Sequence, residues 1–482
     1  MPAGFSVSLV TPPSHAAKTV VMRPWQIIGV ASVLTWAALP ASAWAAGGPI
    51  AFPLWSASPF ALLLLTIALG PLVLEHLWHS DWTKALIVAL LAGPTAFWMM
   101  RYSAEAGAAL RHELEQYVSF VVLLFTLYVV AGGIVLRGDL RGTPAVNIAF
   151  LSCGAVMANM VGTTGASMVL IRPFLRINHD RKHTAHLPVF FVFIVSNLGG
   201  LLTPLGDPPL FLGFLNGVPF GWTLRLWPQW LLANGLTLAM FAVVDWRAWR
   251  QESAASLRLE SEHIRPLRIR GRINILLMLG VLACVLLHSP RVGAALGQWV
   301  GRDLTFAFPW GEICLLILSG LSLALTRRIL RAENAFSWGP IREVAIVFAG
   351  IFVTMVPALH LLELHGASFG LSRGWHYFWL TGSMSAVLDN APTYLIFATM
   401  AAGSNDIGRL VQDRPDLLAA ISCGAVFFGA LTYIGNGPNF MVKAIAEQSH
   451  YPMPSFLRYS ARAALVLIPI FVIVTFVFFR PF

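Results

Sequence analysis

Charged residues are scarce in this chain. They make up 11% of its 482 residues, whereas hydrophobic residues make up 57% and the mean hydropathy is +0.72. A soluble globular protein carries about 25% charged residues, so the composition excludes an ordinary soluble domain. Apolar runs long enough to cross a bilayer recur along the whole sequence. We therefore expect an all-α, polytopic membrane protein whose main partner is the lipid bilayer.

Acidic residues are fewer than basic ones, at 22 against 32, which gives a formal net charge of +10. An excess of this kind can indicate nucleic-acid binding. Here the basic residues lie in short loops between apolar runs, where Lys and Arg determine which side of the membrane a loop faces. The charge therefore predicts topology, and we expect no nucleic-acid partner.

Cysteine is also rare. The four cysteines are Cys153, Cys284, Cys314 and Cys423, and each stands alone inside an apolar segment. No pair has the spacing of a metal site, and an extramembrane disulfide framework is excluded. We expect these residues to be small buried hydrophobes.

The first 45 residues have the layout of a secretory signal. Lys18 and Arg23 precede an apolar stretch over 25–39, and the small-residue site Ala43-Trp44-Ala45 follows. This order predicts a cleaved N-terminal segment. The alternative is an uncleaved first transmembrane helix.

Ten segments are candidates for crossing the membrane: 59–78, 84–100, 115–136, 187–217, 222–244, 272–289, 310–326, 343–362, 417–447 and 459–479. Two of them, 187–217 and 417–447, are longer than the ~20 residues that one crossing needs, and each is interrupted by a Gly/Pro patch. We interpret both as broken helices. Two further apolar regions, 146–171 and 375–401, have a polar kink in the middle, which leaves halves too short to cross. They are interpreted as re-entrant helical hairpins, which occur where backbone is buried in protein or lines a cavity.

The order of these elements divides the chain into two repeats. The first repeat, 46–244, holds hairpin 146–171 and broken helix 187–217; the second, 272–482, holds hairpin 375–401 and broken helix 417–447. The basic stretch 245–271 is expected to be a cytoplasmic linker between them.

The distribution of Lys and Arg predicts that the repeats are inverted. If hairpin 146–171 enters from the cytoplasm, the loops 172–183, 245–272 and 326–342 are cytoplasmic and carry 15 Lys and Arg, against 5 in the opposing loops. That bias agrees with the positive-inside rule. The second hairpin then enters from the opposite side.

The two broken helices share one sequence frame. Leu202-Thr203-Pro204-Leu205-Gly206-Asp207-Pro208-Pro209 matches Leu431-Thr432-Tyr433-Ile434-Gly435-Asn436-Gly437-Pro438 at the Leu-Thr pair, at the Gly and at the acid or amide after it. Helices broken at membrane depth in both halves are the best sequence indication of a transporter's binding site. The candidate cation, proton and substrate residues are Asn159, Thr163, Thr164, Ser196, Asn197, Thr203, Asp207, Asp389, Asn390, Thr393, Thr432, Asn436 and Asn439.

Asp207 and Asp389 are the most informative of these residues, because each lies inside an apolar stretch, one in each half. A charge at mid-membrane costs at least about 2.5–3.5 kcal/mol, so it is retained where it pairs, binds an ion or titrates. One carboxylate that can hold either a proton or Na⁺ is the minimum machinery of an antiporter. The alternative is a buried Asp that only caps the helix at the break.

A desolvated Na⁺ requires several oxygens, which carboxylates, amides, hydroxyls and the carbonyls of unwound helices supply. The residues expected to bind Na⁺ are Asn159, Asp207, Asp389, Asn390 and Asn436. No cofactor is expected besides Na⁺ and H⁺ as coupling ions.

The motifs Thr203-Pro204-Leu205-Gly206-Asp207-Pro208-Pro209 and Asp389-Asn390-Ala391-Pro392-Thr393 resemble those of the ion transporter superfamily, in particular its sodium/proton antiporter and citrate-transport branch. The resemblance implies inverted repeats, a homodimer and elevator-type alternating access. The composition fits a protein of a bacterial inner membrane. The resemblance also implies one cation site per repeat. By position the sites comprise Asn159, Thr163 and Asp207 in one repeat, and Asp389, Asn390, Thr393 and Asn436 in the other.

These features favour a sodium/proton antiporter, and other activities of the same fold stay open. The hairpin tips lack the Ser-Asn-Thr triplet of dicarboxylate symporters, and no tip carries Arg or Lys to meet a substrate carboxylate. A citrate-like symporter of small organic anions and an arsenite-type pump are the alternatives. An intramembrane protease with two aspartates is disfavoured, because Leu388 stands where such enzymes have Tyr and Pro204 where they have Gly; we expect no enzymatic activity.

Overall fold

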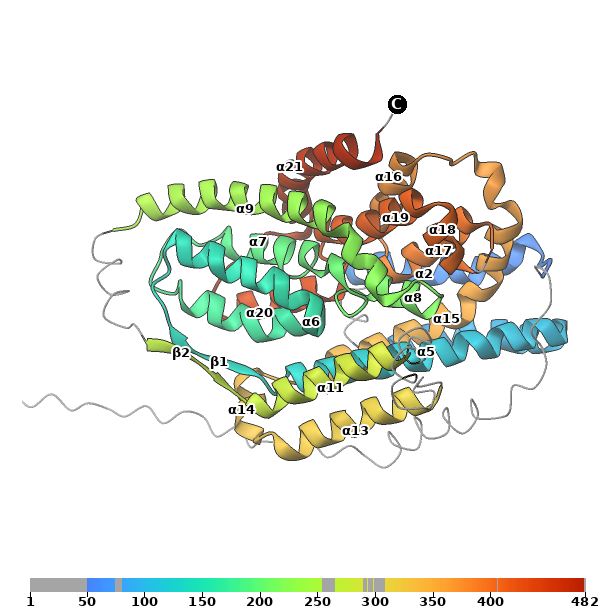
Figure 1. The fold of residues 1–482 in the computed structure, drawn as a ribbon, viewed down its shortest axis with the longest axis horizontal. Helices are drawn as coiled ribbons and strands as arrows, with labels where there is room; N and C mark the ends of the chain where they lie inside the picture. The colour runs from blue at the N-terminus through green and yellow to red at the C-terminus, as the bar shows by residue number, and fades with distance from the viewer. Residues whose placement is uncertain are drawn as a thin grey trace, which may run out of the picture. The chain divides into compact units, whose positions relative to one another are not determined.

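The computed structural model describes residues 50–73, 80–253, 265–288, 308–404 and 406–480, together with positions 293 and 298 (Figure 1). The expected signal segment 1–45 lies outside the described residues. Six described helices are long and apolar enough to cross a membrane: Asp81–Tyr102, Ala104–Ala131, Pro144–Arg176, Phe220–Arg250, Gly339–His365 and Phe456–Phe479. Five shorter apolar helices accompany them. The expectation of an all-α polytopic membrane fold is confirmed.

The elements of the first half follow the expected segments. In order they are η1 (Leu54–Ala57), α2 (Ser58–Val73), α4 (Asp81–Tyr102), α5 (Ala104–Ala131), β1 (Val135–Asp139), α6 (Pro144–Arg176), α7 (Leu187–Ile194), η2 (Leu198–Leu202), α8 (Pro208–Leu215), η3 (Phe220–Leu226) and α9 (Trp227–Arg250).

The second half follows in the same way. Its elements are β2 (Arg265–Arg270), α11 (Arg272–His288), α13 (Trp310–Leu325), α14 (Arg328–Glu333), α15 (Gly339–His365), η4 (Gly366–Phe369), α16 (Gly374–Ser385), α17 (Asn390–Ala402), η5 (Ile407–Arg409), α18 (Leu410–Asp413), α19 (Pro415–Phe428), η6 (Gly429–Leu431), α20 (Gly437–Gln448), α21 (Phe456–Val474) and η7 (Thr475–Phe479), a π-helical turn.

Helix α6 is a hairpin. Its backbone breaks at Gly162, where φ is 77° and ψ is 155°. The side-chain amides of Asn147 and Asn178, near its two ends, are 2.9 Å apart. These residues would be about 46 Å apart along a straight helix. The expected re-entrant shape of 146–171 is therefore present, and Gly162 makes the turn because its positive φ is unfavourable for other residues.

The second hairpin is formed by α16 and α17, which are separated by a short turn ending at Asp389. The rings of Tyr377 and Phe397, on opposite arms, lie 6.4 Å apart between centroids. A straight helix would separate them by about 30 Å. The region 375–401 thus also folds back on itself.

Both expected broken helices are interrupted where the sequence has its Gly/Pro patches. The first runs as α7, the 3₁₀ turn η2 and α8, and the second as α19, the 3₁₀ turn η6 and α20. Pro208 and Pro438 stand in the first turn of the resumed helices, where a missing N–H costs nothing. Asp207 and Asn436 occupy the N-cap positions before them.

The long helices α4, α5 and α15 pack together, and α11 and α13 lie against α5 (Figure 1). Helix α6 contacts α5, α9 and α20, while α17 contacts α8, α15 and α19. The turns of both hairpins consequently meet the breaks of both interrupted helices, and that meeting point holds the candidate site.

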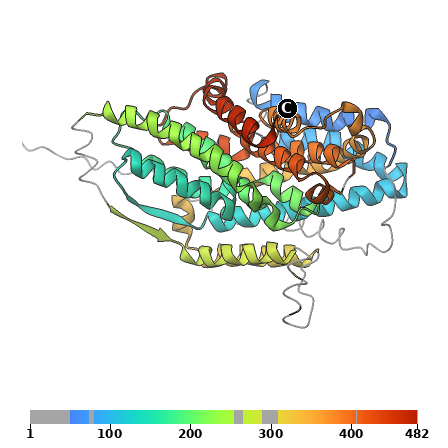
Figure 2. The same cartoon turned by 45° about the horizontal axis from the view of Figure 1, so that its top comes forward.

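The segment expected to be the linker, 245–271, differs from a simple loop at both ends. Helix α9 runs on to Arg250, so Asp245 is a buried helical residue. Residues Arg265–Arg270 form β2, which pairs antiparallel with β1. Figure 2 shows this two-stranded ribbon beside the start of α11. The alternation of Leu and Ile with Arg over 267–270 has the period of a strand, which the expectation of a linker overlooked.

Candidate functional site

The candidate site is centred on the carboxylate of Asp207, whose residue is 1% exposed. Its Oδ1 accepts hydrogen bonds from Thr163 Oγ1 at 2.8 Å and from Asn436 Nδ2 at 3.0 Å. Its Oδ2 accepts from Asn390 Nδ2 at 2.5 Å. The donors come from the first hairpin, the second broken helix and the second hairpin. One carboxylate therefore joins elements of both halves, and its three side-chain partners are all neutral.

Two glycines allow the backbone to approach closely enough to build this site. A Cβ on Gly206 would lie 2.1 Å from the carbonyl oxygen of Gly200, which is impossible without moving the backbone. The carbonyl of Gly206 in turn accepts a hydrogen bond from the backbone N–H of Thr163 at 2.8 Å. The unwound segment is thus fixed to the hairpin tip directly beside Asp207.

A chain of amides continues from Asp207 into the second half. Asn436 Nδ2 also donates to the carbonyl oxygen of Ser196 at 3.1 Å. Asn197 Nδ2 donates to Asn439 Oδ1 at 2.8 Å, and Asn439 Nδ2 donates to the carbonyls of Gly429 and Thr432. These asparagines are buried, so they join the unwound parts of the two broken helices into one polar network.

Two threonines act in equivalent ways in the two halves. Thr203 Oγ1 donates to the carbonyl oxygen of Asn159 at 2.5 Å, and Thr432 Oγ1 donates to that of Ala386 at 2.5 Å. Each bond ties a broken helix to the hairpin tip of its own half. Asn159 itself contacts backbone, with Nδ2 donating to Gly199 O and Oδ1 accepting from Leu202 N. In this conformation Asn159 therefore fixes the break and does not bond to Asp207.

The remaining candidate residues lie around this core. Asp389 caps α17 through a hydrogen bond from the N–H of Ala391 at 3.1 Å, and Thr393 Oγ1 donates to the Asp389 carbonyl. Ser196 Oγ pairs with Ser167 Oγ at 2.8 Å. Thr164 lines a small cavity of about 60 Å³ together with Thr163 and Asp207. The structure thus brings Thr163, Asp207, Asn390 and Asn436 together, and it places Asp389 at a helix cap.

The chemistry of the site is that of oxygen and amide groups. Among the described residues, no group of three or more His, Cys, Asp or Glu is placed to hold a metal ion. Asn390 Oδ1 is buried and has no hydrogen-bond partner within the described part of the chain. A buried amide oxygen beside a carboxylate is an acceptor that a cation or a proton could satisfy.

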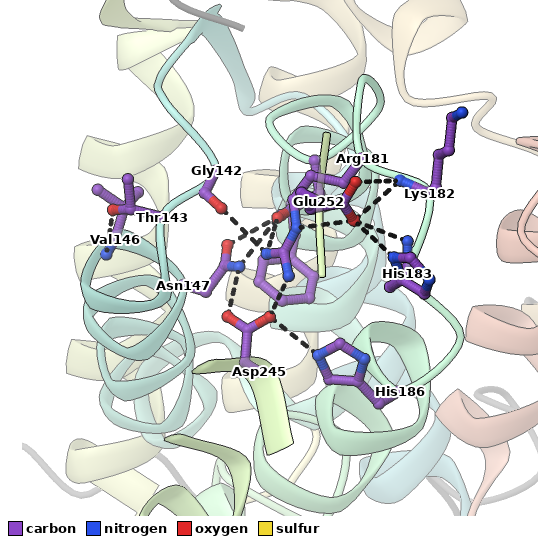
Figure 3. A network of polar contacts seen from close by, with 12 residues as sticks. Gly142, Thr143, Val146, Asn147, Arg181, Lys182, His183, His186, Asp245 and Glu252 are labelled. Atoms are coloured by element: carbon purple, nitrogen blue, oxygen red, sulfur yellow. Dashed lines mark hydrogen bonds and ion pairs between the residues drawn. The ribbon is translucent and has the colours of Figure 1, made fainter. Parts of the chain in front are cut away.

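One buried polar cluster was not predicted from the sequence (Figure 3). Arg181 and Asp245 form an ion pair at 2.6 Å with both side chains fully buried. Asn147 Nδ2 donates to Asp245 Oδ2 at 2.9 Å, and His186 Nε2 lies 2.9 Å from Asp245 Oδ1. We name these residues and Glu252 the hairpin clasp, because they join both ends of α6 to α9. Asp245 and Arg181 were assigned to polar connecting segments, so only their opposite charges could have indicated the pair.

Glu252 completes the clasp just beyond α9. Its carboxylate accepts hydrogen bonds from the backbone N–H groups of Lys182 and His183, at 3.0 Å and 2.8 Å. Burial alone would raise the pKa of Glu252, but these donors and the nearby charges of His183 and Arg181 outweigh it and hold the pKa below its ordinary value. The loop after α6 is thereby fixed by an ionised carboxylate.

Comparisons with known proteins agree with this architecture. The family described as "Putative citrate transport" matches residues 50–479. The chain belongs to this family. It is also similar to uncharacterized transporters of Mycobacterium bovis and Mycobacterium tuberculosis, each 26% identical over 353 residues, which cover 68% of this chain and 75% of each relative. Family membership and the apolar helices together identify a multi-pass membrane transporter.

Proposed function

We propose that this transporter is a secondary active transporter in which Asp207 exchanges a proton for a cation, most simply Na⁺. The observation that carries this proposal is the position of one buried carboxylate at the junction of two hairpins and two broken helices. A carboxylate removed from water must be neutralised, and either a proton or a bound cation can do so. Exclusive occupancy by one or the other is the coupling that antiport requires.

The surroundings of Asp207 support both states. Its partners Thr163, Asn390 and Asn436 can turn hydroxyl or carbonyl oxygens toward a cation. The distance of 2.5 Å between Asn390 and Asp207 also falls within the range of an O–H···O hydrogen bond. With the Asn390 amide turned over, a protonated Asp207 would donate to its oxygen. The cavity of about 60 Å³ beside the carboxylate has room for a few water molecules along the path of an ion.

Alternating access is proposed to move the hairpins and broken helices as one unit relative to α4, α5 and α15. The equivalent roles of Thr203 and Thr432 support the proposal that the halves are inverted repeats. The resemblance drawn from the motifs adds a homodimer to this proposal, and the composition adds a bacterial inner membrane. Asp389, next to Asn390, is proposed as the acidic residue of the second repeat.

A sodium- or proton-coupled citrate symporter is the second candidate, and the family match favours it. The amide groups of Asn197, Asn436 and Asn439 could donate to a carboxylate in place of the Arg or Lys that the hairpin tips lack. In this case the cation held at Asp207 would offset part of the substrate's negative charge.

The test uses purified protein in proteoliposomes that contain a trapped pH dye. A pulse of Na⁺ or Li⁺ is expected to change the internal pH rapidly, and K⁺ serves as the comparison. Asp207→Asn and Asp389→Asn are each expected to abolish the exchange while the protein still inserts. Full exchange by either variant would remove that carboxylate from the mechanism. A flat trace for the unmodified protein, with uptake of labelled citrate that depends on Na⁺ or pH, would select the symporter.

A further inference from the structure

A cavity lined by charged side chains lies away from the Asp207 site. It has a volume of about 830 Å³ and lies between the β1–β2 ribbon, the end of α6 and α14. Its charged lining residues are Arg137, Arg172, Arg176, Arg268, Arg270 and Glu333. Five positive charges therefore face one negative charge among the described side chains that line it.

The single carboxylate is already occupied. Arg137 forms an ion pair with Glu333 through two hydrogen bonds, one of them from Nε at 2.8 Å. The hydrogen bond from Arg137 lowers the pKa of Glu333, and the charges of Arg270 and Arg176 lower it further. Glu333 is thus ionised and paired with Arg137. The positive charges of the other four arginines are therefore not compensated by a carboxylate within the described lining.

Without a counter-ion, repulsion among these arginines destabilises the β1–β2 ribbon. Arg137 and Arg268 are direct partners across the antiparallel ribbon, and like charges opposite each other destabilise a sheet. An isolated two-stranded ribbon is itself only marginally stable. Arg172 Nη1 is buried and has no hydrogen-bond partner among the described residues. A buried guanidinium donor without an acceptor leaves a place for a bound group, an anion or a water molecule, that would accept its hydrogen bond.

The position of the cavity indicates what that group is. Helix α6 ends at Arg176 and α11 begins at Arg272, so the ribbon lies where apolar helices leave the hydrocarbon core. The Lys and Arg bias expected from the sequence places this end in the cytoplasm. Basic pockets between transmembrane helices on that side bind the head groups of anionic lipids. Guanidinium groups also form bidentate hydrogen bonds with phosphate oxygens.

We propose that this cavity binds the phosphate-bearing head group of an anionic phospholipid, held by Arg172 and Arg176 on α6 and by Arg268 and Arg270 on the ribbon. The bound phosphate joins the end of the first hairpin to β2, the strand that pairs with β1 and leads into α11. It neutralises the repulsion across the strands and satisfies Arg172. The lipid therefore stabilises the folded protein from outside the ion site.

The test compares lipid binding by full-length protein in micelles that contain phosphatidylglycerol, cardiolipin or zwitterionic phosphatidylcholine. Cardiolipin and phosphatidylglycerol are expected to raise the melting temperature, and phosphatidylcholine is not. R268Q/R270Q should weaken binding of the anionic lipids by about tenfold or more, because charge-assisted hydrogen bonds are lost. R247Q/R250Q is the matched control, since it removes two exposed arginines of α9 and should leave binding unchanged.

Inorganic pyrophosphate distinguishes the source of the phosphate. If it competes with the lipid, the site also takes free phosphate groups; if it does not while anionic lipid binds, the acyl chains are part of the ligand. Equal binding of anionic and zwitterionic lipid would overturn the proposal. So would equal losses in the two double variants, because the effect would then follow net charge alone. If R268Q/R270Q folds poorly, R268K/R270K replaces it as the test variant. Because it keeps both positive charges, it should bind anionic lipid more weakly than the unmodified protein but more tightly than R268Q/R270Q.

Discussion

Removing one partner of the buried pair Arg181–Asp245 should destabilise the protein strongly. Both side chains are fully buried at 2.6 Å, and loss of one partner from such a pair costs about 3–5 kcal/mol because the other charge is left in a low-dielectric interior. In Asp245→Asn, Arg181 keeps hydrogen bonds to Gly142 O and Asn178 Oδ1, and Glu252 lies 4.0 Å away. We therefore expect Asp245→Asn to lower the free energy of unfolding by about 3 kcal/mol, the lower end of that range.

The assay is reversible unfolding of purified protein in mixed micelles, followed by tryptophan fluorescence. The control is Asp406→Asn, which breaks the exposed pair with Arg409 and should cost less than about 1 kcal/mol. A double-mutant cycle adds Arg181→Met. Each single variant leaves one buried charge of the pair without its partner, whereas the double variant removes both charges. The double variant should therefore cost at least about 1 kcal/mol less than the sum of the two single variants. Equal costs for Asp245→Asn and Asp406→Asn would refute the clasp.

Three further outcomes follow from the site and the clasp. Gly206→Ala should abolish the yield of folded protein, because its Cβ would clash with the backbone of Gly200. A Cβ on Gly437 would meet no atom within 4 Å, so Gly437→Ala should be recovered normally. Equal yields on size-exclusion chromatography would contradict the close backbone approach of Gly206 to Gly200. Thr163→Val removes a donor to the central carboxylate and should shift the cation dependence of transport. Thr237→Val, whose hydroxyl bonds to the carbonyl of Ala233 within α9, should not; transport titrations compare the two. The pKa of Glu252 is held below its ordinary value, so the ionised carboxylate stabilises the fold at neutral pH, and this contribution is lost as the pH falls through the folded pKa. Melting temperatures of Glu252→Gln and of the unmodified protein should therefore converge in acid. A difference that stays constant with pH would contradict this expectation.

The backbone plan of the protein was accessible from its sequence. Length and apolar composition predicted the spanning helices, and the polar kink within 146–171 and the patches around Gly206 and Gly435 marked the turn and the breaks. These features are local, because glycine and proline act on the backbone where they stand. The structure accordingly has its hairpins and interrupted helices at the expected places.

Contacts between distant residues were less accessible. The sequence suggested one cation site in each half, but Asn390 and Asn436 both donate to Asp207 in this conformation. Asn159 looked like a ligand and instead bonds to backbone, because an unwound helix leaves donors and acceptors that side chains must satisfy. The β1–β2 ribbon was missed since its arginines suggested a loop, although their alternation has the period of a strand.

The central claim is that Asp207 holds either a proton or Na⁺, and proton release on Na⁺ binding tests it most directly. Purified protein in weakly buffered detergent is mixed with NaCl while a pH dye is recorded, with choline chloride at equal ionic strength as the control. We expect acidification with Na⁺ alone, and no acidification from Asp207→Asn. Proton release of the same size from Asp207→Asn, or no release from the unmodified protein, would contradict it.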